Sequence, residues 1–446
     1  MLRRRGRAAA RVDASAERIA EAARWAAWCG RVVEERRPED VRLLLARLRG
    51  VAADGPPQVR AVVSETLAQA PAVLLPLLDR YAREGRGAGG PVAVSPDLLG
   101  RLVASLAPDG RVRQAAVEAL AAYGGPLPAA ALAVRAADWV PEVSAGAWAA
   151  LTSRSAPDEA PAVVGVLLGL QARRRAQGLL GEYRSVLAEP AQRRAVRALA
   201  AHADPPVRRF GVELALDLGE YVRGDLLRAA LYDTDQVCRR LCAQRLLELD
   251  PEQAGRLLWA RGAGVRELAV SALPADVPAT RLVAPLTDRA RMVRAQARWK
   301  LYQRGEPPAD VYRKQLRRAG AKADASPRLL AGLTAGLGEC GDPVDVGLLA
   351  RLLPDPRAAV RRAAVRAVGR LAKPCELVPL LAPLANDPDP GVARHVFEAL
   401  ARVPEEVPPE TLWIGRTRTE PAVRRLAERI GVRGAKGYTQ SGQSPR

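Results

Sequence analysis

The sequence predicts an all-α fold, a right-handed α-solenoid superhelix, and three observations lead to this prediction. A phrase of roughly 31 residues recurs along most of the 446-residue chain. Alanine and leucine dominate a composition that is 48% hydrophobic but only 4% aromatic, which suits closely packed helices better than sheets. A single core rarely grows to this length, so a stack of small units is expected.

The recurring phrase is an acidic turn, then a valine that is often followed by arginine, then an Ala/Leu-rich helix. Clear copies are DPRAAVRRAA from Asp355, DPDPGVARHVFEAL from Asp387, ADPPVRRFGVELAL from Ala203 and PDGRVRQAAVEAL from Pro108. The valine falls at positions 59, 112, 143, 207, 237, 265, 293, 360, 392 and 423. The two long intervals, 64 and 67 residues, each equal about two periods, so we expect unmarked repeats near residues 175 and 328.

Each repeat is expected to be a helical hairpin, because a period near 31 residues leaves room for two short helices and two turns. In the clearest copy, Val360, Ala364 and Val368 recur at the spacing of one helical face. Asp355 and Pro356 just before them provide a turn and a helix start. One hairpin cannot bury its apolar face alone, so neighbouring hairpins must stack.

The phrase Asp-Pro-x-x-x-Val-Arg-x-x-Ala resembles the HEAT family, especially the short bacterial form called HEAT-like or bilin-lyase-type repeats. The resemblance covers roughly residues 40–432. It implies about eleven or twelve HEAT-like helical hairpins, with the second helix of each hairpin on the concave surface. It also implies a scaffold, since most members of this family are scaffolds.

Three segments are expected along the chain. Residues 1–38 form a basic amphipathic N-terminal capping helix, in which Trp25 and Trp28 can cover the apolar face of the first repeat. Residues 39–433 form the repeat solenoid, and residues 434–446, rich in Gly, Ser and Gln, form a disordered tail.

The net charge of +20 and the pI of about 10.7 indicate an acidic partner, either a protein or a nucleic acid. Nearly all of this charge is arginine, and Ala, Gly, Pro and Arg are enriched together, so the base composition of a GC-rich genome is an alternative explanation. Five irregularly spaced cysteines do not form a disulfide framework and favour a cytoplasmic location. No run of 18 apolar residues exists, so no membrane-spanning helix is expected.

An arginine follows the marked valine in seven of ten copies, and Ser144, Cys238 and Ala393 are the exceptions. The resemblance implies that this arginine, beside the turn aspartate, makes a structural ladder of charge-assisted hydrogen bonds between repeats. The predicted ladder residues are Arg60, Arg113, Arg208, Arg266, Arg294, Arg361 and Arg424.

A second set of arginines forms a stripe on the opposite face of the second helix. Arg362, Arg366 and Arg370 are spaced four residues apart, and Arg425 and Arg429 repeat the pattern near the C-terminus. If second helices line the concave surface, these five residues form a partner-binding patch for carboxylates or phosphates. The middle position of the stripe is glutamate in other repeats, so the surface should be basic only in places; these glutamates are Glu65, Glu118, Glu213 and Glu398.

The sequence contains no constellation of catalytic or metal-binding residues. The two histidines, His202 and His395, belong to no Cys/His or His-Glu cluster, which excludes the paired ligands of HEAT-fold iron hydroxylases. Cys238 and Cys242 do not complete a zinc site and are expected to be buried. No Gly-rich phosphate loop occurs. We therefore predict no catalytic residue, metal, cofactor or small-molecule substrate.

These observations favour a non-catalytic scaffold that binds an acidic protein partner on its concave surface. Sequence-independent binding of nucleic acid through arginine patches is a second hypothesis. An alkyl-base DNA glycosylase of HEAT-like fold is a third, because such enzymes use an aspartate and tryptophans in a concave cleft. The candidate residues for this third hypothesis are Asp138, Trp139, Trp148, Trp259 and Trp299.

Overall fold

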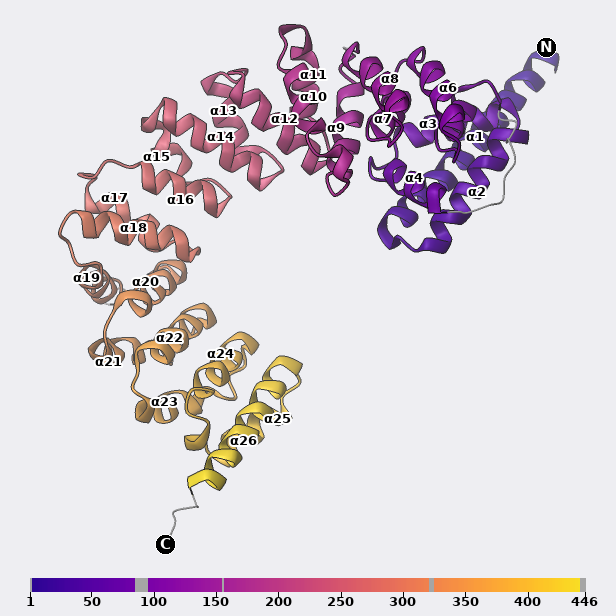
Figure 1. The fold of residues 1–446 in the computed structure, drawn as a ribbon. Coiled ribbons are helices and arrows are strands. Elements are labelled where there is room, and N and C mark those ends of the chain that lie inside the picture. Colours follow the sequence, from indigo (N-terminus) through magenta and orange to yellow (C-terminus); the bar gives the residue numbers. More distant parts are fainter. Residues whose placement is uncertain (1, 85–94, 155, 321–324, 442–446) are drawn as a thin grey trace. The chain divides into compact units, whose positions relative to one another are not determined.

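The computed structural model describes residues 2–84, 95–154, 156–320 and 325–441. These residues form α-helices and short 3-10 helices, with no strand among them, so the all-α prediction is confirmed (Figure 1). The chain divides into two compact units, unit 1 (Met1–Asp225) and unit 2 (Leu226–Arg446).

Helices follow one another as pairs, and we call the members of each pair the first helix and the second helix. The described residues contain twelve such pairs, from α2/α3 and α5/α6 to α25/α26, which agrees with the predicted number of repeats. The repeats predicted near residues 175 and 328 are present, with α10 and α20 as their second helices.

The helices of unit 1 are α1 (Leu2–Glu35), α2 (Pro38–Asp54), α3 (Pro57–Ala68), α4 (Leu74–Glu84), α5 (Leu98–Ser105), α6 (Gly110–Ala121), α7 (Pro126–Ala136), α8 (Pro141–Thr152), α9 (Glu159–Gly169), η1 (Arg174–Ala176), α10 (Leu179–Leu187), η2 (Pro190–Gln192), α11 (Arg193–Ala200), α12 (Pro205–Asp217) and the start of α13 (Arg223–Tyr232).

The helices of unit 2 are α14 (Gln236–Leu249), η3 (Pro251–Gln253), α15 (Ala254–Leu257), α16 (Ala263–Ala272), α17 (Ala279–Leu286), α18 (Arg291–Gln303), α19 (Pro308–Gly320), α20 (Pro327–Cys340), η4 (Pro343–Asp345), α21 (Val346–Ala350), α22 (Ala358–Leu371), α23 (Pro374–Leu381), η5 (Ala382–Leu384), α24 (Pro390–Leu400), η6 (Pro404–Glu406), α25 (Pro409–Thr417) and α26 (Pro421–Ser441).

Proline and aspartate explain where many of these helices begin. Proline is the first residue of α3, α8, α20 and α24, where its missing N–H removes no helical hydrogen bond. The side chains of Asp109 and Asp389 precede α6 and α24 and accept hydrogen bonds from backbone N–H groups of the first turn. The acidic, proline-containing turn in the sequence is therefore the start of a second helix in the clear copies of the repeat.

Small residues bring the second helices of unit 2 close together. A Cβ atom added to Gly338 of α20 would lie 2.4 Å from the Cβ of Ala367 in α22. One added to Gly369 of α22 would lie 2.7 Å from the Cβ of Ala399 in α24. These glycines occupy the same position on successive helices, so the close approach is part of the repeat.

The marked valines form much of the core. Seven of the ten are at most 1% exposed: Val143, Val207, Val265, Val293, Val360, Val392 and Val423. Val112 is 39% exposed, and Val237 is only half-buried. Cys238 is fully buried instead, and so is Cys242, as expected from the sequence; burial raises the pKa of both thiols to about 12.

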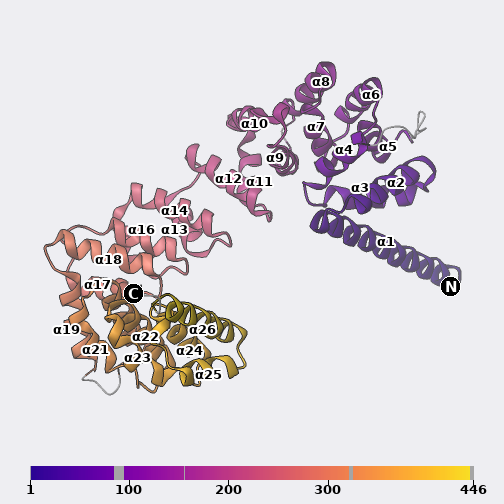
Figure 2. The ribbon, with the colours of Figure 1, turned by 60° about the horizontal axis from the view of Figure 1, so that its bottom comes forward.

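Helix α1 packs along α3 in unit 1, as Figure 2 shows. Trp25 is buried and Trp28 is half-buried, with ring centroids 5.6 Å apart. At the other end of the chain, α26 includes part of the predicted tail, while residues 442–446 lie outside the described residues. The boundaries at 38/39 and 433/434 stay predictions.

Candidate partner-binding groove

In three repeats the turn arginine ties its own turn to the next one, and Arg361 shows the pattern. Arg361 donates from Nη1 to the backbone oxygens of Asp355 (2.9 Å) and Pro356 (3.0 Å) in its own turn. Its Nε and Nη2 donate to the two carboxylate oxygens of Asp387 in the next turn, at 2.7 and 2.9 Å. Asp387 also accepts the N–H of Asp389 at 2.8 Å, so one carboxylate shapes its turn and receives the neighbouring arginine.

The same bidentate pair recurs with Arg113 and Asp138, and with Arg266 and Asp288. The distances are 2.9 and 3.0 Å in the first pair and 2.7 and 2.8 Å in the second. Burial alone would raise the pKa values of Asp138 and Asp288, but hydrogen bonds from Arg113 and Arg266, a backbone N–H and nearby arginine charges together outweigh it and lower both. Both aspartates are therefore charged partners at neutral pH.

The other predicted ladder residues make related but different contacts. Arg60 pairs with Asp97, the N-cap of α5. Arg294 donates to the backbone oxygen of Asp288 (2.5 Å) and to the carboxylate of Glu339 in α20. Arg208 and Arg424 donate to oxygens of their own turns, those of His202 (3.2 Å) and of Arg418 (2.9 Å) respectively.

Sequence reasoning missed one turn arginine, Arg239. It donates to the backbone oxygens of Asp233 (2.6 Å) and Thr234 (3.2 Å), six and five residues before it, as Arg361 does in its own turn. In this repeat the marked Val237 is one residue out of register, and Cys238 occupies the buried position. In this repeat and in that of Arg361, the arginine follows the turn aspartate by six residues. This spacing identifies Arg239 in the sequence.

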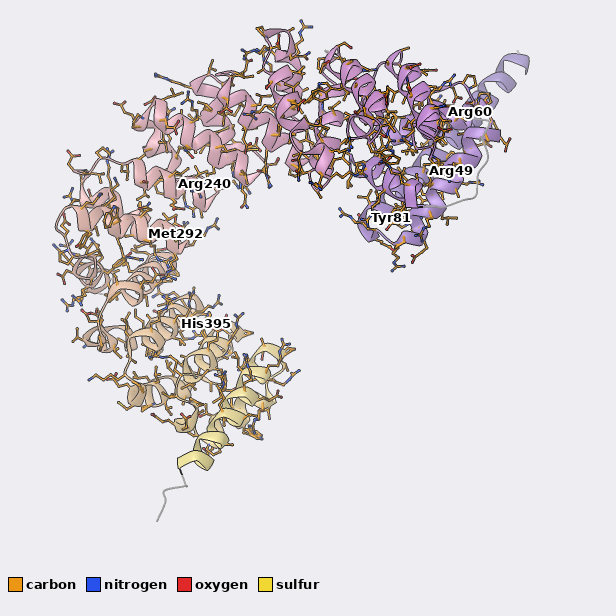
Figure 3. All side chains as sticks on the ribbon, viewed as in Figure 1. Arg49, Arg60, Tyr81, Arg240, Met292 and His395 are labelled. Carbon is orange, nitrogen blue, oxygen red and sulfur yellow. The ribbon has the colours of Figure 1, made fainter. Side chains whose placement is uncertain are left out.

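Arg362, Arg366 and Arg370 line one groove of about 550 Å³, together with residues of α18 and α20. The figures show the second helices of unit 2 side by side, with Arg240, Met292 and His395 on their common exposed side (Figures 1 and 3). Small residues also line the groove, among them Ala331 and Ala335 of α20. We call this feature the arginine groove; its arginines are Arg289, Arg291, Arg294, Arg328, Arg362, Arg366 and Arg370.

Two acidic residues, Asp288 and Glu339, line the arginine groove, and the side chain of Glu339 is only 2% exposed. It accepts hydrogen bonds from Arg294 (Nε, 3.2 Å) and Arg298 (Nη1, 2.7 Å). Burial alone would raise the pKa of Glu339, but these two arginines outweigh burial and lower it. The Nη1 of Arg370 lies 3.8 Å from the same carboxylate.

The groove arginines differ in how far their charges are neutralised. Arg362 contacts both carboxylate oxygens of Asp389, at 3.0 and 2.9 Å. Arg291, Arg328 and Arg366 are exposed and have no carboxylate within ion-pair distance among residues 17–435 that the structure describes. The groove therefore presents positive charge that its own acids do not neutralise.

Arg425 and Arg429, predicted as part of the same patch, line a different groove. This second groove, of about 690 Å³, lies between α24 and α26 and also contains Arg394, Glu398 and Glu428. Glu398 contacts Arg394 (2.7 Å) and His395 Nδ1 (2.6 Å). The predicted patch is thus two grooves, the first strongly basic and the second mixed in charge.

Three of the five residues proposed for a glycosylase, Asp138, Trp139 and Trp148, make structural contacts in unit 1, whereas Trp259 and Trp299 of unit 2 are 78% and 54% exposed. Asp138 is 1% exposed and accepts hydrogen bonds from Arg113 and Arg135, so its carboxylate cannot reach a substrate base. The guanidinium groups of Arg83 and Arg113 lie over the Trp139 ring, 4.2 and 4.4 Å from its centroid. Trp148 packs edge-on against Tyr183.

Two further searches of the described residues gave negative results. No group of three or more His, Cys, Asp and Glu side chains in this part of the chain could hold a metal ion. Among the same residues, no helix combines the length and the apolar character needed to cross a membrane.

Comparison with known proteins adds the following. The family model for HEAT repeats matches residues 344–430, which confirms the HEAT resemblance over these residues. No curated protein matches the sequence.

Among solved structures, Kap121p bound to Nup53p is similar, with 13% identity over 93% of this chain and 48% of that chain, at a TM-score of 0.30. Importin beta is also similar, with 12% identity over 90% of this chain and 58% of that chain, at a TM-score of 0.38. The chain thus spans about half the length of these structures.

Proposed function

We propose that this chain, which carries HEAT repeats at residues 344–430, is a scaffold whose arginine groove binds an acidic segment of a protein partner. The observation that carries the proposal is the unneutralised charge of this groove: Arg291, Arg328 and Arg366 are exposed, line one hollow and have no carboxylate partner in the part of the chain that the structure describes.

The shape and charge of the groove support a protein segment as its occupant. Small residues of α20 line the groove, so a main chain can approach this helix closely, while the guanidinium groups that also line it offer bidentate hydrogen bonds to carboxylates. Charges of this kind favour fast encounter with an acidic partner and discriminate against basic ones.

The test is affinity capture from native lysate with three versions of the full chain. They are the wild type, the groove variant Arg362→Glu/Arg366→Glu/Arg370→Glu and a control, Arg317→Glu/Arg318→Glu/Arg351→Glu. The control makes the same change of net charge at exposed positions on α19 and just after α21. We expect an acidic protein to bind in stoichiometric amounts to the wild type and the control, and to be lost from the groove variant.

Capture of the same proteins by all three versions would contradict binding in the groove. If nucleic acid co-purifies with the wild type and no protein is lost from the groove variant, the second hypothesis replaces the first.

The net charge of +20 favours sequence-independent binding of nucleic acid as the second candidate. The salt dependence of the affinity for a nucleic-acid duplex distinguishes this candidate from binding of a protein segment. If three groove arginines neutralise phosphates, log K should fall against log salt with a slope of roughly −3. The groove variant would lose that slope, and a wild type without measurable binding at low salt would exclude this candidate.

A further inference from the structure

The centre of the arginine groove holds three guanidinium groups that lack a close acidic partner. Arg291 is the first residue of α18, and Arg366 and Arg370 come from α22. In the described part of the chain, the nearest carboxylate contact of this trio is that of Arg370 with Glu339, at 3.8 Å. Glu339 is already engaged by Arg294 and Arg298, so it cannot neutralise the trio.

These positive charges lie close enough to act on one another. Burial is the largest cause that lowers the pKa of Arg370, and the charge of Arg366 lowers it further. The charge of Glu339 acts in the opposite direction, but Arg291 and Arg294 also lower this pKa, so the net direction is down. The arrangement is costly unless an anion joins it, because like charges held together repel.

The surroundings of the trio leave room for such an anion. Ala331 and Ala335 of α20 and Ala363 of α22 line the groove between the arginines and cannot fill it. Glu339 holds Arg294 and Arg298 in fixed positions beneath this space. The guanidinium groups can therefore converge on a compact ligand from several sides.

The positive charge is focal, which argues against an extended polyanion. Glu267 on α16 occupies the helix position that Arg362 has on α22. Glu398 and Glu428 line the next groove toward the C-terminus. A nucleic acid presents phosphates at regular intervals, so a track for it over these helices would have to pass Glu267, Glu398 and Glu428. In the next groove the two acids stand beside Arg394, Arg425 and Arg429, so the charge there is mixed.

A phosphoryl group matches this focal charge better than a carboxylate does. A carboxylate brings one negative charge and two oxygens, whereas a phosphorylated side chain brings about −1.5 to −2 charges and three acceptor oxygens. Three planar guanidinium forks offer more donors than one carboxylate can accept.

We propose that Arg291, Arg366 and Arg370 form a subsite for a phosphoserine or phosphothreonine on the protein segment that the groove binds. This inference rests on the proposed function and adds the chemistry of the partner. Arg328, at the other side of the groove, would contact acidic residues that flank the phosphorylated one.

Three degenerate peptide libraries test this proposal on the immobilised full-length protein. The libraries are identical except for a fixed central residue, which is phosphoserine, serine or glutamate. We expect the phosphoserine library to be retained roughly tenfold more strongly than the other two, the factor that one charge-assisted hydrogen bond provides.

The same measurement on variants locates the site. Arg366→Gln/Arg370→Gln should abolish the preference for phosphoserine, while the control Arg317→Gln/Arg318→Gln, which removes the same charge from α19, should keep it. Circular dichroism confirms that both variants are folded.

Three results would overturn the proposal. Equal retention of the glutamate library would leave the acidic-segment function standing without phosphate recognition. A phosphoserine preference that survives in Arg366→Gln/Arg370→Gln would place the site elsewhere. No retention of any library, or tighter groove-dependent binding of an oligonucleotide of equal charge, would exclude a phosphorylated segment. The capture experiment judges the proposed function separately.

Discussion

Helix α22 carries a turn arginine and groove arginines, and the two kinds are used in opposite ways. In α22, Arg361 is the fourth residue after the N-cap and is bound by Asp387 and its own turn, whereas Arg366, the ninth, is exposed without an acidic partner. The fourth position points toward the next turn, and the ninth points away from the core. Position along the helix, rather than residue type, decides whether an arginine makes structural contacts or is available to bind a ligand.

Acid should weaken the turn contacts of the whole molecule at once, and we expect this to be the largest effect. Asp138, Asp288 and Glu339 have pKa values in the folded chain below their ordinary values of about 4. A lowered pKa in the folded state means that the stabilisation is complete above the unfolded pKa and is lost as pH falls through the folded one. The free energy of unfolding should stay level from about pH 8 to 6 and fall steeply below about pH 4.

Urea unfolding at a series of pH values checks this, with Asp288→Asn as the comparison. The variant should start lower and fall less steeply. A main loss of stability near pH 6.5 would instead indicate titration of histidine, and the paired carboxylates would not be the cause.

Substitution of a single turn arginine should have the next largest effect. Arg113→Ala leaves Asp138 with one partner fewer in the interior and should cost about 3–5 kcal/mol. Arg111→Ala, at an exposed position two residues earlier on α6, should cost less than about 0.5 kcal/mol. Hydrogen exchange of α6 to α8 should rise only in the first variant, and equal exchange in both would contradict a structural role for Arg113.

Glu339→Gln sharpens the comparison because it should move stability and binding in opposite directions. Loss of the charged acceptor of Arg294 and Arg298 should cost about 1.5–3 kcal/mol of unfolding free energy. It also removes one negative charge from the arginine groove, so binding of a poly-glutamate probe should strengthen. Unchanged or weaker binding of poly-glutamate would show that Glu339 does not limit the charge of the groove.

The smallest predicted effect on stability comes from supplying the acidic partner that Arg239 lacks in the turn ladder. Arg239 has a buried Nε without a hydrogen-bond partner in the described chain, and Ala260 stands where Asp288 and Asp387 stand in later turns. Ala260→Asp should therefore stabilise the chain by about 1 kcal/mol. In an Arg239→Ala background the same change should destabilise, since the aspartate is then buried alone; a gain in both backgrounds would refute the pairing.

Much of the fold could be predicted from the sequence, because turn residues and helical periodicity repeat. The repeats predicted near residues 175 and 328 correspond to α10 and α20, although in α20 a leucine, Leu330, is the buried residue of the first turn in place of a valine. The register of α14 could not be read from valine alone, because Cys238 fills the buried position there. A valine is only one way to fill a core site, whereas the distance from turn aspartate to arginine is fixed by geometry.

The arginine groove could be predicted only in part. Arg362, Arg366 and Arg370 were identified by their spacing on one helix. Arg291 and Glu339 come from α18 and α20, and their approach to α22 depends on how the hairpins pack. The separation of Arg425 and Arg429 into another groove depends on α24 lying between α22 and α26. Such relations between repeats are tertiary and leave no local pattern.

Chemical labelling of arginine with a dicarbonyl reagent, followed by peptide mass spectrometry, tests the central claim most directly. We expect Arg291, Arg328 and Arg366 to react quickly, Arg113, Arg266 and Arg361 to react slowly, and poly-glutamate to protect the first set while Arg317, Arg318 and Arg351 stay reactive. Equal reaction of turn and groove arginines, or equal protection of the groove and of α19, would contradict the division of roles.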